Sequence, residues 1–223
     1  MNNFYAIIPA AGMGSRFGGK TKKQFLRLKG KSLLDWTLDC FLKTRIFQRI
    51  VVCLPVGELT LIRPPSVGAS ISYIEGGATR AESVYNGFCH LHLRDDDIVL
   101  VHDAVRPLLS SDLIRRVAKE AGEKGSTIPV IPVSDTIKEI KDGVVSKTID
   151  RSRLAAAQTP QGFPAGVLKK VYKKLKLNDP QWTDEAMMVE AIGEKVHAVE
   201  GELRNIKVTT AEDLRMAEYY LNM

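Results

Sequence analysis

The fold class of this chain follows from one stretch near its start, Phe4-Tyr5-Ala6-Ile7-Ile8-Pro9-Ala10-Ala11-Gly12-Met13-Gly14-Ser15-Arg16. The apolar run over residues 4–9 is typical of a strand buried on both faces. The small residues and glycines after it let backbone N–H groups approach phosphate oxygens closely, because no large side chain obstructs them. Arg16 and the nearby Lys23 add positive charge that can neutralise charge on a phosphorus under attack. The stretch therefore predicts a strand followed by a polyphosphate-binding loop.

The same region also contains the pattern G-x-x-x-x-G-K-T, over residues 14–21. In that pattern the lysine grips the β and γ phosphates and the threonine holds Mg²⁺, and the strand that ends at Asp103 could supply its acidic metal partner. Such a loop normally lies directly on a strand end and opens a sustained helix, whereas little sequence separates Lys23 from Gly30 here. A P-loop-type nucleotide-binding module is therefore the less favoured hypothesis, and a glycine-rich turn with solvated lysines is a further alternative.

Composition indicates a globular chain. The 223 residues suit one domain, and 44% of them are hydrophobic. No apolar run is long enough to span a membrane and no signal peptide pattern precedes the first strand, so we expect a soluble cytoplasmic protein with no membrane partner. Cys40, Cys53 and Cys89 lie far apart in apolar surroundings. They are expected to be buried thiols, neither disulfides nor zinc ligands.

Positive charge is concentrated around the glycine-rich loop. The formal net charge of the chain is +6, and residues 1–50 carry ten Lys and Arg side chains against only Asp35 and Asp39. A basic domain could bind nucleic acid, but no helix-turn-helix, zinc-finger or RNP signature is present, nor a basic stripe interleaved with aromatics. A small anionic substrate explains the charge better, so no nucleic-acid partner is expected.

Apolar runs alternate with helical patterns along most of the chain. This alternation predicts a Rossmann-like α/β fold, in which helices flank both faces of a mainly parallel twisted sheet, as a single domain over residues 1–223. Ligands of such sheets bind beyond the carboxyl ends of the strands, where the first loop and Asp103 lie. The expected strands are residues 4–9, 50–54, 71–74, 98–102 and 128–133. Helices are expected after Ser32, after Thr79, near Ser111, and over residues 164–176, 183–192 and 210–221.

Residues 134–155 interrupt this alternation. Residues 136–140 and 144–149 flank Asp142-Gly143, a dipeptide that favours the positive φ angles of a tight hairpin. The pattern predicts a two-stranded β-arm that projects from the sheet. Because such a hairpin is marginally stable alone, we expect it to dock against a second subunit of a homodimer.

Two further motifs add groups that could bind a nucleotide. Gly76 and Gly77 precede a capped helix and Arg80, so exposed backbone N–H groups could read a nucleobase and a triphosphate. Asp103 and Arg106 place a carboxylate and a guanidinium at one strand end, which suits a metal-polyphosphate on one side and an anion on the other. A simple ion pair between them is the alternative.

The histidines indicate neither a metal site nor a catalytic base. His90 and His92 are two residues apart on a predicted helix and point to nearly opposite sides. His102 and His197 lie in strand-like surroundings, where packed or hydrogen-bonded side chains are expected.

The ordered set of motifs resembles the 2-C-methyl-D-erythritol 4-phosphate cytidylyltransferase family over nearly all of the sequence. That family makes a CDP-alcohol in the non-mevalonate isoprenoid pathway. One motif alone would be weak, whereas the ordered set is specific. The motifs are Pro9-Ala10-Ala11-Gly12-x-Gly14-x-Arg16, Lys23-Gln24, Gly76-Gly77-x-x-Arg80-x-x-Ser83, His102-Asp103-Ala104-x-Arg106-Pro107, Asp135-Thr136, Asp150-Arg151, Gln158-Thr159-Pro160-Gln161, Thr183-Asp184-Glu185 and Asn205-Ile206-Lys207-Val208-Thr209.

The resemblance implies that the phosphate of methylerythritol phosphate attacks the α-phosphorus of CTP and expels pyrophosphate. It further implies Mg²⁺ that bridges triphosphate oxygens, with Asp103 as a ligand either directly or through water. The implied catalytic residues are Arg16, Lys23, Arg151 and Lys207. The implied CTP-binding residues are Ala10, Ala11, Gly12, Gly14, Gly76, Gly77, Arg80, Ser83, Asp103 and Ala104. Those implied for the small alcohol phosphate are Asp103, Arg106, Asp135, Thr136, Thr159 and Thr183.

The sequence departs from the family pattern at Ala78, where an acidic residue is common, and at Val105, where alanine is common. Neither change removes an implied catalytic cation. The resemblance also implies that the arms of a dimer complete each other's sites, since Thr136 and Arg151 would cluster with the distant Lys207. A ribitol-5-phosphate cytidylyltransferase remains the alternative, because phosphate clamps do not distinguish one short polyol from another.

Overall fold

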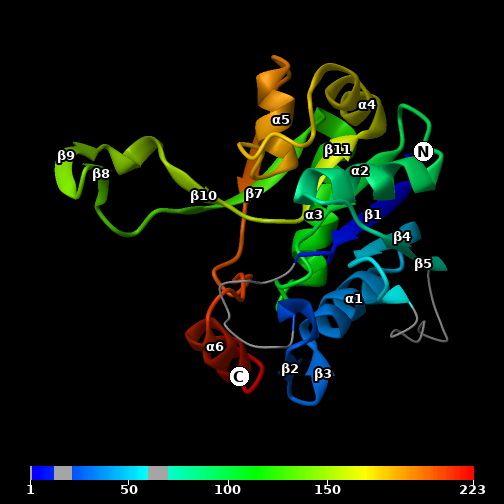
Figure 1. Cartoon of the computed structure of the whole chain (residues 1–223), viewed down its shortest axis with the longest axis horizontal. Helices are drawn as coiled ribbons and strands as arrows, with labels where there is room; N and C mark the ends of the chain where they lie inside the picture. Colours follow the sequence, from blue (N-terminus) through cyan, green and yellow to red (C-terminus); the bar gives the residue numbers. More distant parts are fainter. Residues whose placement is uncertain (1, 13–21, 60–69) are drawn as a thin grey trace.

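The computed structural model describes residues 2–12, 22–59 and 70–223. Its centre is an eight-stranded sheet in the order β10-β7-β11-β6-β1-β4-β5, with β12 paired to β7 (Figure 1). Six of these strands run in one direction, and β10 and β11 run against them, so the predicted mainly parallel sheet is confirmed. The strands are β1 (Phe4–Pro9), β4 (Phe47–Leu54), β5 (Ser70–Glu75), β6 (Ile98–Val101), β7 (Thr127–Pro132), β10 (Ala155–Ala157), β11 (Gln161–Pro164) and β12 (His197–Glu200).

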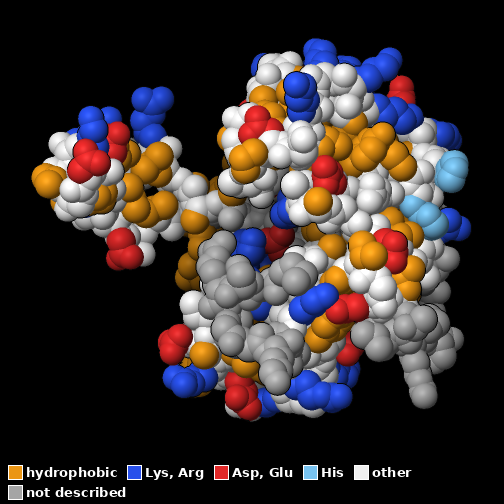
Figure 2. All heavy atoms as spheres, in the orientation of Figure 1, with side chains coloured by type: hydrophobic (Ala, Val, Ile, Leu, Met, Phe, Trp, Pro, Cys, Tyr) orange, Lys and Arg blue, Asp and Glu red, His pale blue; other side chains and the backbone are white. Residues whose placement is uncertain are grey.

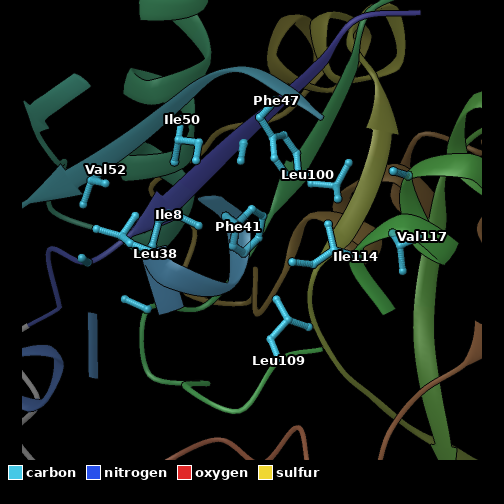
Figure 3. Close-up of a cluster of buried hydrophobic side chains, with 14 of the residues drawn as sticks. Ile8, Leu38, Phe41, Phe47, Ile50, Val52, Leu100, Leu109, Ile114 and Val117 are labelled. Carbon is cyan, nitrogen blue, oxygen red and sulfur yellow. The ribbon is translucent and has the colours of Figure 1, made fainter. Parts of the chain in front are cut away.

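Helices cover both faces of this sheet, as the alternation predicts. The helices are α1 (Leu33–Thr44), α2 (Arg80–Leu91), α3 (Ser111–Lys124), α4 (Ala165–Lys174), α5 (Glu185–Ala191) and α6 (Ala211–Tyr220). Successive residues of β1 show the two faces. Ile8 packs in one core cluster with α1 and α3, drawn in Figure 3, whereas Ile7 packs in a second cluster with α2, α4 and α5. Burial of alternate strand residues on opposite faces is what makes these strands read as continuous apolar runs.

Local capping explains where the two helices nearest the nucleotide motifs begin. Ser32 and Asp35 form a reciprocal capping box at α1, and Thr79 and Glu82 form one at α2. Each box satisfies two backbone N–H groups that the helix itself cannot pair. The predicted starts of both helices are confirmed.

The β-arm is also present. Strands β8 (Ile137–Lys141) and β9 (Val144–Ile149) pair antiparallel, and the turn between them places Asp142 at φ 51° and Gly143 at φ 80°. These positive φ angles are those that the Asp-Gly dipeptide favours. The arm extends away from the body of the molecule on the chain between β7 and β10 (Figure 1).

Smaller elements complete the chain. A 3-10 turn (Lys23–Phe25) leads to the short strands β2 (Arg27–Leu28) and β3 (Lys31–Ser32), and a second 3-10 turn (Arg151–Arg153) follows the arm. Leu28 and Leu33 pack with Val208 and with Ala217 of α6 in a third cluster. This cluster holds the C-terminal segment against the short strand β2 and the start of α1.

Several sequence predictions differ from the structure. The sequence pattern did not predict β10 and β11, and it suggested β12 only through His197. Helix α5 begins at Glu185 because the Asp184 side chain accepts from the Met187 N–H as its cap, two residues after the expected start. Of the expected buried thiols, Cys53 is buried and Cys40 half-buried, whereas Cys89 is exposed. Cys89 lies in the last turn of α2, where the helix passes the edge of the core.

Candidate active site

A cleft of about 490 Å³ opens at the carboxyl ends of the parallel strands. In Figure 2, acidic and basic side chains lie side by side in the hollow near the middle of the face shown. The cleft is lined by residues that follow β1, by the segment that begins α2, by residues that follow β6, and by the C-terminal segment. These are Pro9 to Gly12, Lys23 and Gln24, Gly77 to Arg80 and Ser83, Asp103 to Val105, and Lys207 and Thr209.

The structure thus gathers many of the predicted site residues in one place. Among the described residues, the cleft contains ten of them: Ala10, Ala11, Gly12, Lys23, Gly77, Arg80, Ser83, Asp103, Ala104 and Lys207. Gly14 and Arg16 lie outside the described residues, as does the whole G-x-x-x-x-G-K-T pattern over residues 14–21.

The loop after β1 is held from behind by a buried amide. The Ala10 N–H donates to the Cys53 carbonyl at 2.8 Å, and the Gln24 side-chain amide donates to the Ala10 carbonyl at 2.6 Å. Gln24 is 3% exposed. It neighbours Lys23, so the same 3-10 turn that braces the loop also brings Lys23 to the cleft. The neighbouring Lys22 instead pairs with Glu58, 2.6 Å between Nζ and Oε1.

The loop that contains Gly76 and Gly77 does not present these two N–H groups to a ligand, although the sequence predicted that it would. The N–H of Gly76 donates to the Leu54 carbonyl at 2.8 Å, and the N–H of Gly77 donates to Ser83 Oγ at 3.0 Å. The expectation that these groups are exposed for a ligand is therefore wrong, because strand β4 and helix α2 already use them. The glycines instead allow close packing. A Cβ on Gly76 would lie 2.4 Å from the Cβ of Ala11, so a larger residue would push the two loops apart.

An ionic cluster lies across the cleft floor, centred on Asp103. Asp103 Oδ1 lies 3.3 Å from Arg80 Nε, and Oδ2 lies 2.9 Å from Lys207 Nζ and 3.5 Å from Arg106 Nε. Burial alone would raise the pKa of the Asp103 carboxyl, but the charges of Arg80, Lys207 and Arg106 outweigh burial and hold that pKa well below its usual range. The carboxylate stays ionised, and it fixes three cations around one point.

Residues behind the cleft brace this cluster. Thr159 Oγ1 accepts from the Asp103 N–H at 3.2 Å, and Arg106 Nη1 donates to the Asn205 carbonyl at 2.8 Å. Asn205, fully buried, donates from its side chain to the Thr159 carbonyl at 2.7 Å. These bonds set the backbone that carries Lys207. Gln24 and Asn205 both stand in the quoted motifs, but the sequence predicted no role for either. Their role follows from the burial of their polar side chains, which only the structure shows.

Arg106 and Thr159 were expected to bind the alcohol phosphate. Both side chains are buried, and neither lines the cleft. In this structure they support Asp103 and Asn205, and their contact with a substrate stays a prediction.

Four more predicted residues, on the arm and before α5, do not line the cleft within one chain. Asp135, Thr136 and Arg151 are exposed at the base of the arm, where the Arg151 guanidinium donates to the Ser134 carbonyl. Thr183 is exposed before α5, with Oγ1 3.7 Å from Met187 Sδ. Their assignment to the substrate stays a prediction.

His102 is packed and hydrogen-bonded, as expected. It is fully buried beside Phe41, with ring centroids 5.3 Å apart. Its Nδ1 lies 2.9 Å from Thr159 Oγ1 and its Nε2 lies 3.3 Å from the Arg106 carbonyl. The Arg106 carbonyl can only accept, so in the neutral imidazole Nε2 carries the hydrogen and Nδ1 accepts from the Thr159 hydroxyl. The imidazole is part of the scaffold behind Asp103.

This burial predicts an acid-sensitive fold. Burial lowers the pKa of His102 to about 3, from 6.5 in an ordinary environment. Below about pH 6.5 the unfolded chain binds a proton there that the folded chain does not, so the free energy of unfolding should fall by up to about 1.4 kcal/mol per pH unit toward pH 3. Urea unfolding at about pH 7 and pH 5 measures this. His102→Asn should unfold with a smaller pH slope; equal slopes would show that His102 contributes nothing.

The acidic residue among the described residues of the cleft lining suits a metal that arrives with a nucleotide. In the described part of the chain, no three His, Cys, Asp or Glu side chains gather as metal ligands. Asp103 is the carboxylate that lines the cleft. Mg²⁺ is commonly held by one or two carboxylates together with substrate phosphates, so this donor set fits Mg²⁺ in company with a triphosphate.

Within the described ranges, no helix is long and apolar enough to cross a membrane.

Known proteins share both the sequence and the fold. The sequence model of the family described as IspD, 2-C-methyl-D-erythritol 4-phosphate cytidylyltransferase, matches residues 4–223. A protein of that name from Bacillus mycoides (strain KBAB4) is 39% identical over 221 residues, covering 97% of each chain. The crystal structure of such an enzyme from Thermus thermophilus is 34% identical, covers 100% of both chains and gives a TM-score of 0.82. That from Francisella tularensis is 34% identical, covers 98% of this chain and 99% of its own, and gives 0.85. This chain therefore belongs to the 2-C-methyl-D-erythritol 4-phosphate cytidylyltransferase family.

Proposed function

We propose that this chain transfers the cytidylyl group of CTP to the phosphate of 2-C-methyl-D-erythritol 4-phosphate, with release of pyrophosphate, in non-mevalonate isoprenoid biosynthesis. One observation carries the proposal: motif residues from separate stretches of the chain meet in a single cleft at the carboxyl edge of the sheet, with Lys23, Arg80, Asp103 and Lys207 in its lining. This edge is where sheets of this kind bind their ligands. The position of the protein in the cytoplasm stays a prediction.

The chemistry needs positioning and charge neutralisation more than proton transfer. A phosphate oxygen of the alcohol phosphate forms the new bond to the α-phosphorus of CTP, and the bond from that phosphorus to the bridging oxygen of pyrophosphate breaks. The attacking monoester is already anionic near neutral pH, so no general base is required. Lys23 and Arg16 neutralise the charge that develops at the α-phosphorus.

Lys207 is suited to receive the second substrate. Its Nζ pairs with Asp103 at 2.9 Å, yet its side chain is 44% exposed, in contrast to the buried carboxylate. An exposed ammonium on a flexible stem can turn from Asp103 to an incoming phosphate at small cost. We assign Lys207, together with Arg151 of a second subunit, to positioning the attacking phosphate.

Asp103 is the residue that would hold Mg²⁺, together with oxygens of the triphosphate. When bound there, Mg²⁺ would neutralise triphosphate charge and favour the departure of pyrophosphate. The cations around Asp103 keep this carboxylate ionised and oriented before the nucleotide arrives.

We also propose a homodimer formed through the arm. Ile140 and Val145 are cross-strand partners, so they lie on the same face of the arm, and they are 57% and 54% exposed. Val144, which precedes Val145 on β9 and points to the opposite face, is 68% exposed. Apolar side chains gathered on a projecting hairpin mark a surface that is covered by another chain. Docking of a partner's arm would bring Thr136 and Arg151 to a cleft that they do not reach within their own chain.

The dimer predicts a clear change of mass. Ile140→Lys combined with Val145→Lys should give the mass of one chain in light scattering, where the unaltered protein gives that of two, because two buried charges would oppose docking. Turnover should fall with it, since the arm residues would no longer reach a partner. The control Thr148→Lys adds one charge to β9 while keeping both apolar side chains, and it should remain dimeric. A monomeric mass for the unaltered protein at working concentration would contradict the dimer.

Pyrophosphate release tests the reaction directly. The purified protein is given CTP and Mg²⁺ with methylerythritol phosphate, with ribitol phosphate, or with neither, and ATP alone in a separate sample. Release that requires methylerythritol phosphate supports the proposal. Release only with ribitol phosphate would favour the alternative cytidylyltransferase, and inorganic phosphate from ATP alone would favour the P-loop-type module.

A further inference from the structure

A buried carboxylate lies just behind the cleft and contacts one of its cations. Glu185, the first residue of α5, is fully buried, and its two oxygens lie 2.8 and 2.9 Å from Arg80 Nη1. Arg80 is the first residue of α2 and lines the cleft, whereas Glu185 does not. A contact between helices 105 residues apart in the sequence therefore sets the orientation of a cleft side chain.

The guanidinium of Arg80 is used on two of its edges. Nη1 is bound by Glu185, and Nε lies 3.3 Å from Asp103 Oδ1. Nη2 is buried and donates to no group in the described part of the structure. A buried donor without a partner costs free energy, and a bound ligand oxygen would remove that cost.

The start of α5 is itself tied to the strand beside Asp103. Gln161 donates from its side-chain amide to Asp184 at 2.8 Å and accepts from the Ala186 N–H at 3.2 Å. Gln161 lies opposite Val101 in the pairing of β11 with β6, the strand that leads to Asp103. The carboxylate of Glu185 is therefore built in with a fixed position relative to Asp103.

From this arrangement we propose that Glu185 is a positioning residue for nucleotide binding, which acts by fixing the Arg80 guanidinium between Asp103 and the nucleotide. Glu185 balances the charge of Arg80, so that Arg80 serves as an oriented hydrogen-bond donor in the cleft. The proposal rests on the proposed function, because it takes CTP as the ligand of the cleft.

Paired substitutions separate this role from a purely structural one. Arg80→Met leaves Glu185 as an unpaired buried carboxylate, so it should lower the melting temperature as well as weaken CTP binding. Adding Glu185→Gln removes that unpaired charge. The double variant should regain melting temperature while its Kd for CTP, measured with Mg²⁺ by calorimetry, stays as weak as that of Arg80→Met.

Glu185→Gln alone keeps the shape of the side chain and removes its charge. It should raise the Kd and the KM for CTP about tenfold, the effect of one weakened charged hydrogen bond, and leave the KM for the alcohol phosphate within about twofold. Glu190→Gln, an exposed carboxylate on the same helix, is the control and should change neither value.

Three outcomes overturn the inference. The first is that Glu185→Gln leaves the Kd for CTP unchanged. The second is that the effects of the two substitutions on this Kd multiply in the double variant, and the third is that the double variant regains CTP affinity along with stability. Each would show that Glu185 does not act through Arg80. Failure of the unaltered protein to bind CTP would overturn the proposed function, and the inference with it.

Discussion

Lys23→Ala is expected to lower the rate of pyrophosphate release by about 10²–10³-fold at saturating CTP, the usual cost of removing one preorganised donor to a developing charge. Lys23 lies in the 3-10 turn that Gln24 anchors to the loop after β1, and it lines the cleft. Arg16→Ala should have an effect of similar size. The measurement is the initial rate with both substrates and Mg²⁺.

Two lysines serve as matched controls. Lys22 is adjacent in sequence and pairs with Glu58 without lining the cleft, so Lys22→Ala removes the same charge and should change the rate no more than about threefold. Lys20→Ala should be similarly mild. A loss of turnover confined to Lys20→Ala would contradict the roles assigned to Lys23 and Arg16. It would identify the pattern over residues 14–21 as the nucleotide site.

Asp103→Asn is expected to remove both activity and stability. The amide keeps the shape of the side chain but leaves Arg80, Arg106 and Lys207 around a neutral group, and breaking a buried charge cluster in this way costs about 3 kcal/mol of unfolding free energy. Turnover should fall by at least about 10²-fold, because the carboxylate that would hold Mg²⁺ is lost. Urea unfolding and initial rates measure the two effects.

A second buried carboxylate provides the comparison. Asp97 is 2% exposed and accepts from the Arg94 N–H at 2.9 Å and from the Asn3 side chain at 3.1 Å. It lies at the start of β6, the opposite end of that strand from Asp103. Asp97→Asn should lower stability and leave kcat nearly unchanged. If Asp103→Asn behaves in the same way, Asp103 is a structural carboxylate only.

The strands that the sequence predicts most directly are those buried on both faces. Strands β1, β4 and β6 are flanked by neighbours on both sides and contribute buried residues to both helix-covered clusters, so their residues are apolar in succession. Strand β11 also has a neighbouring strand on each side, but its sequence is Gln-Gly-Phe-Pro. Gly162 is required there because a Cβ would lie 2.8 Å from Ala121 Cβ, and Gln161 is required to hold α5. Tertiary contacts explain both residues, and no local pattern could.

The candidate site divides in the same way. Ordered motifs identified Lys23, Arg80, Asp103 and Lys207 as members of one site, and the cleft contains all four. Their mutual geometry depends on side chains distant in sequence, such as Glu185 against Arg80 and Asn205 against Arg106. The prediction that the N–H groups of Gly76 and Gly77 are exposed was wrong for the same reason, since these groups donate to partners in β4 and α2.

By itself, the sequence determined the alternation of strands and helices, the capped starts of α1 and α2, the hairpin turn of the arm and the family. Each of these features depends on the spacing of residue types within a short stretch of sequence, or on the order of motifs along the chain. Only the tertiary structure decided which groups of the cleft are already paired and which residues brace it. A hydrogen bond or an ion pair depends on distances of about 3 Å between atoms that the fold alone brings together.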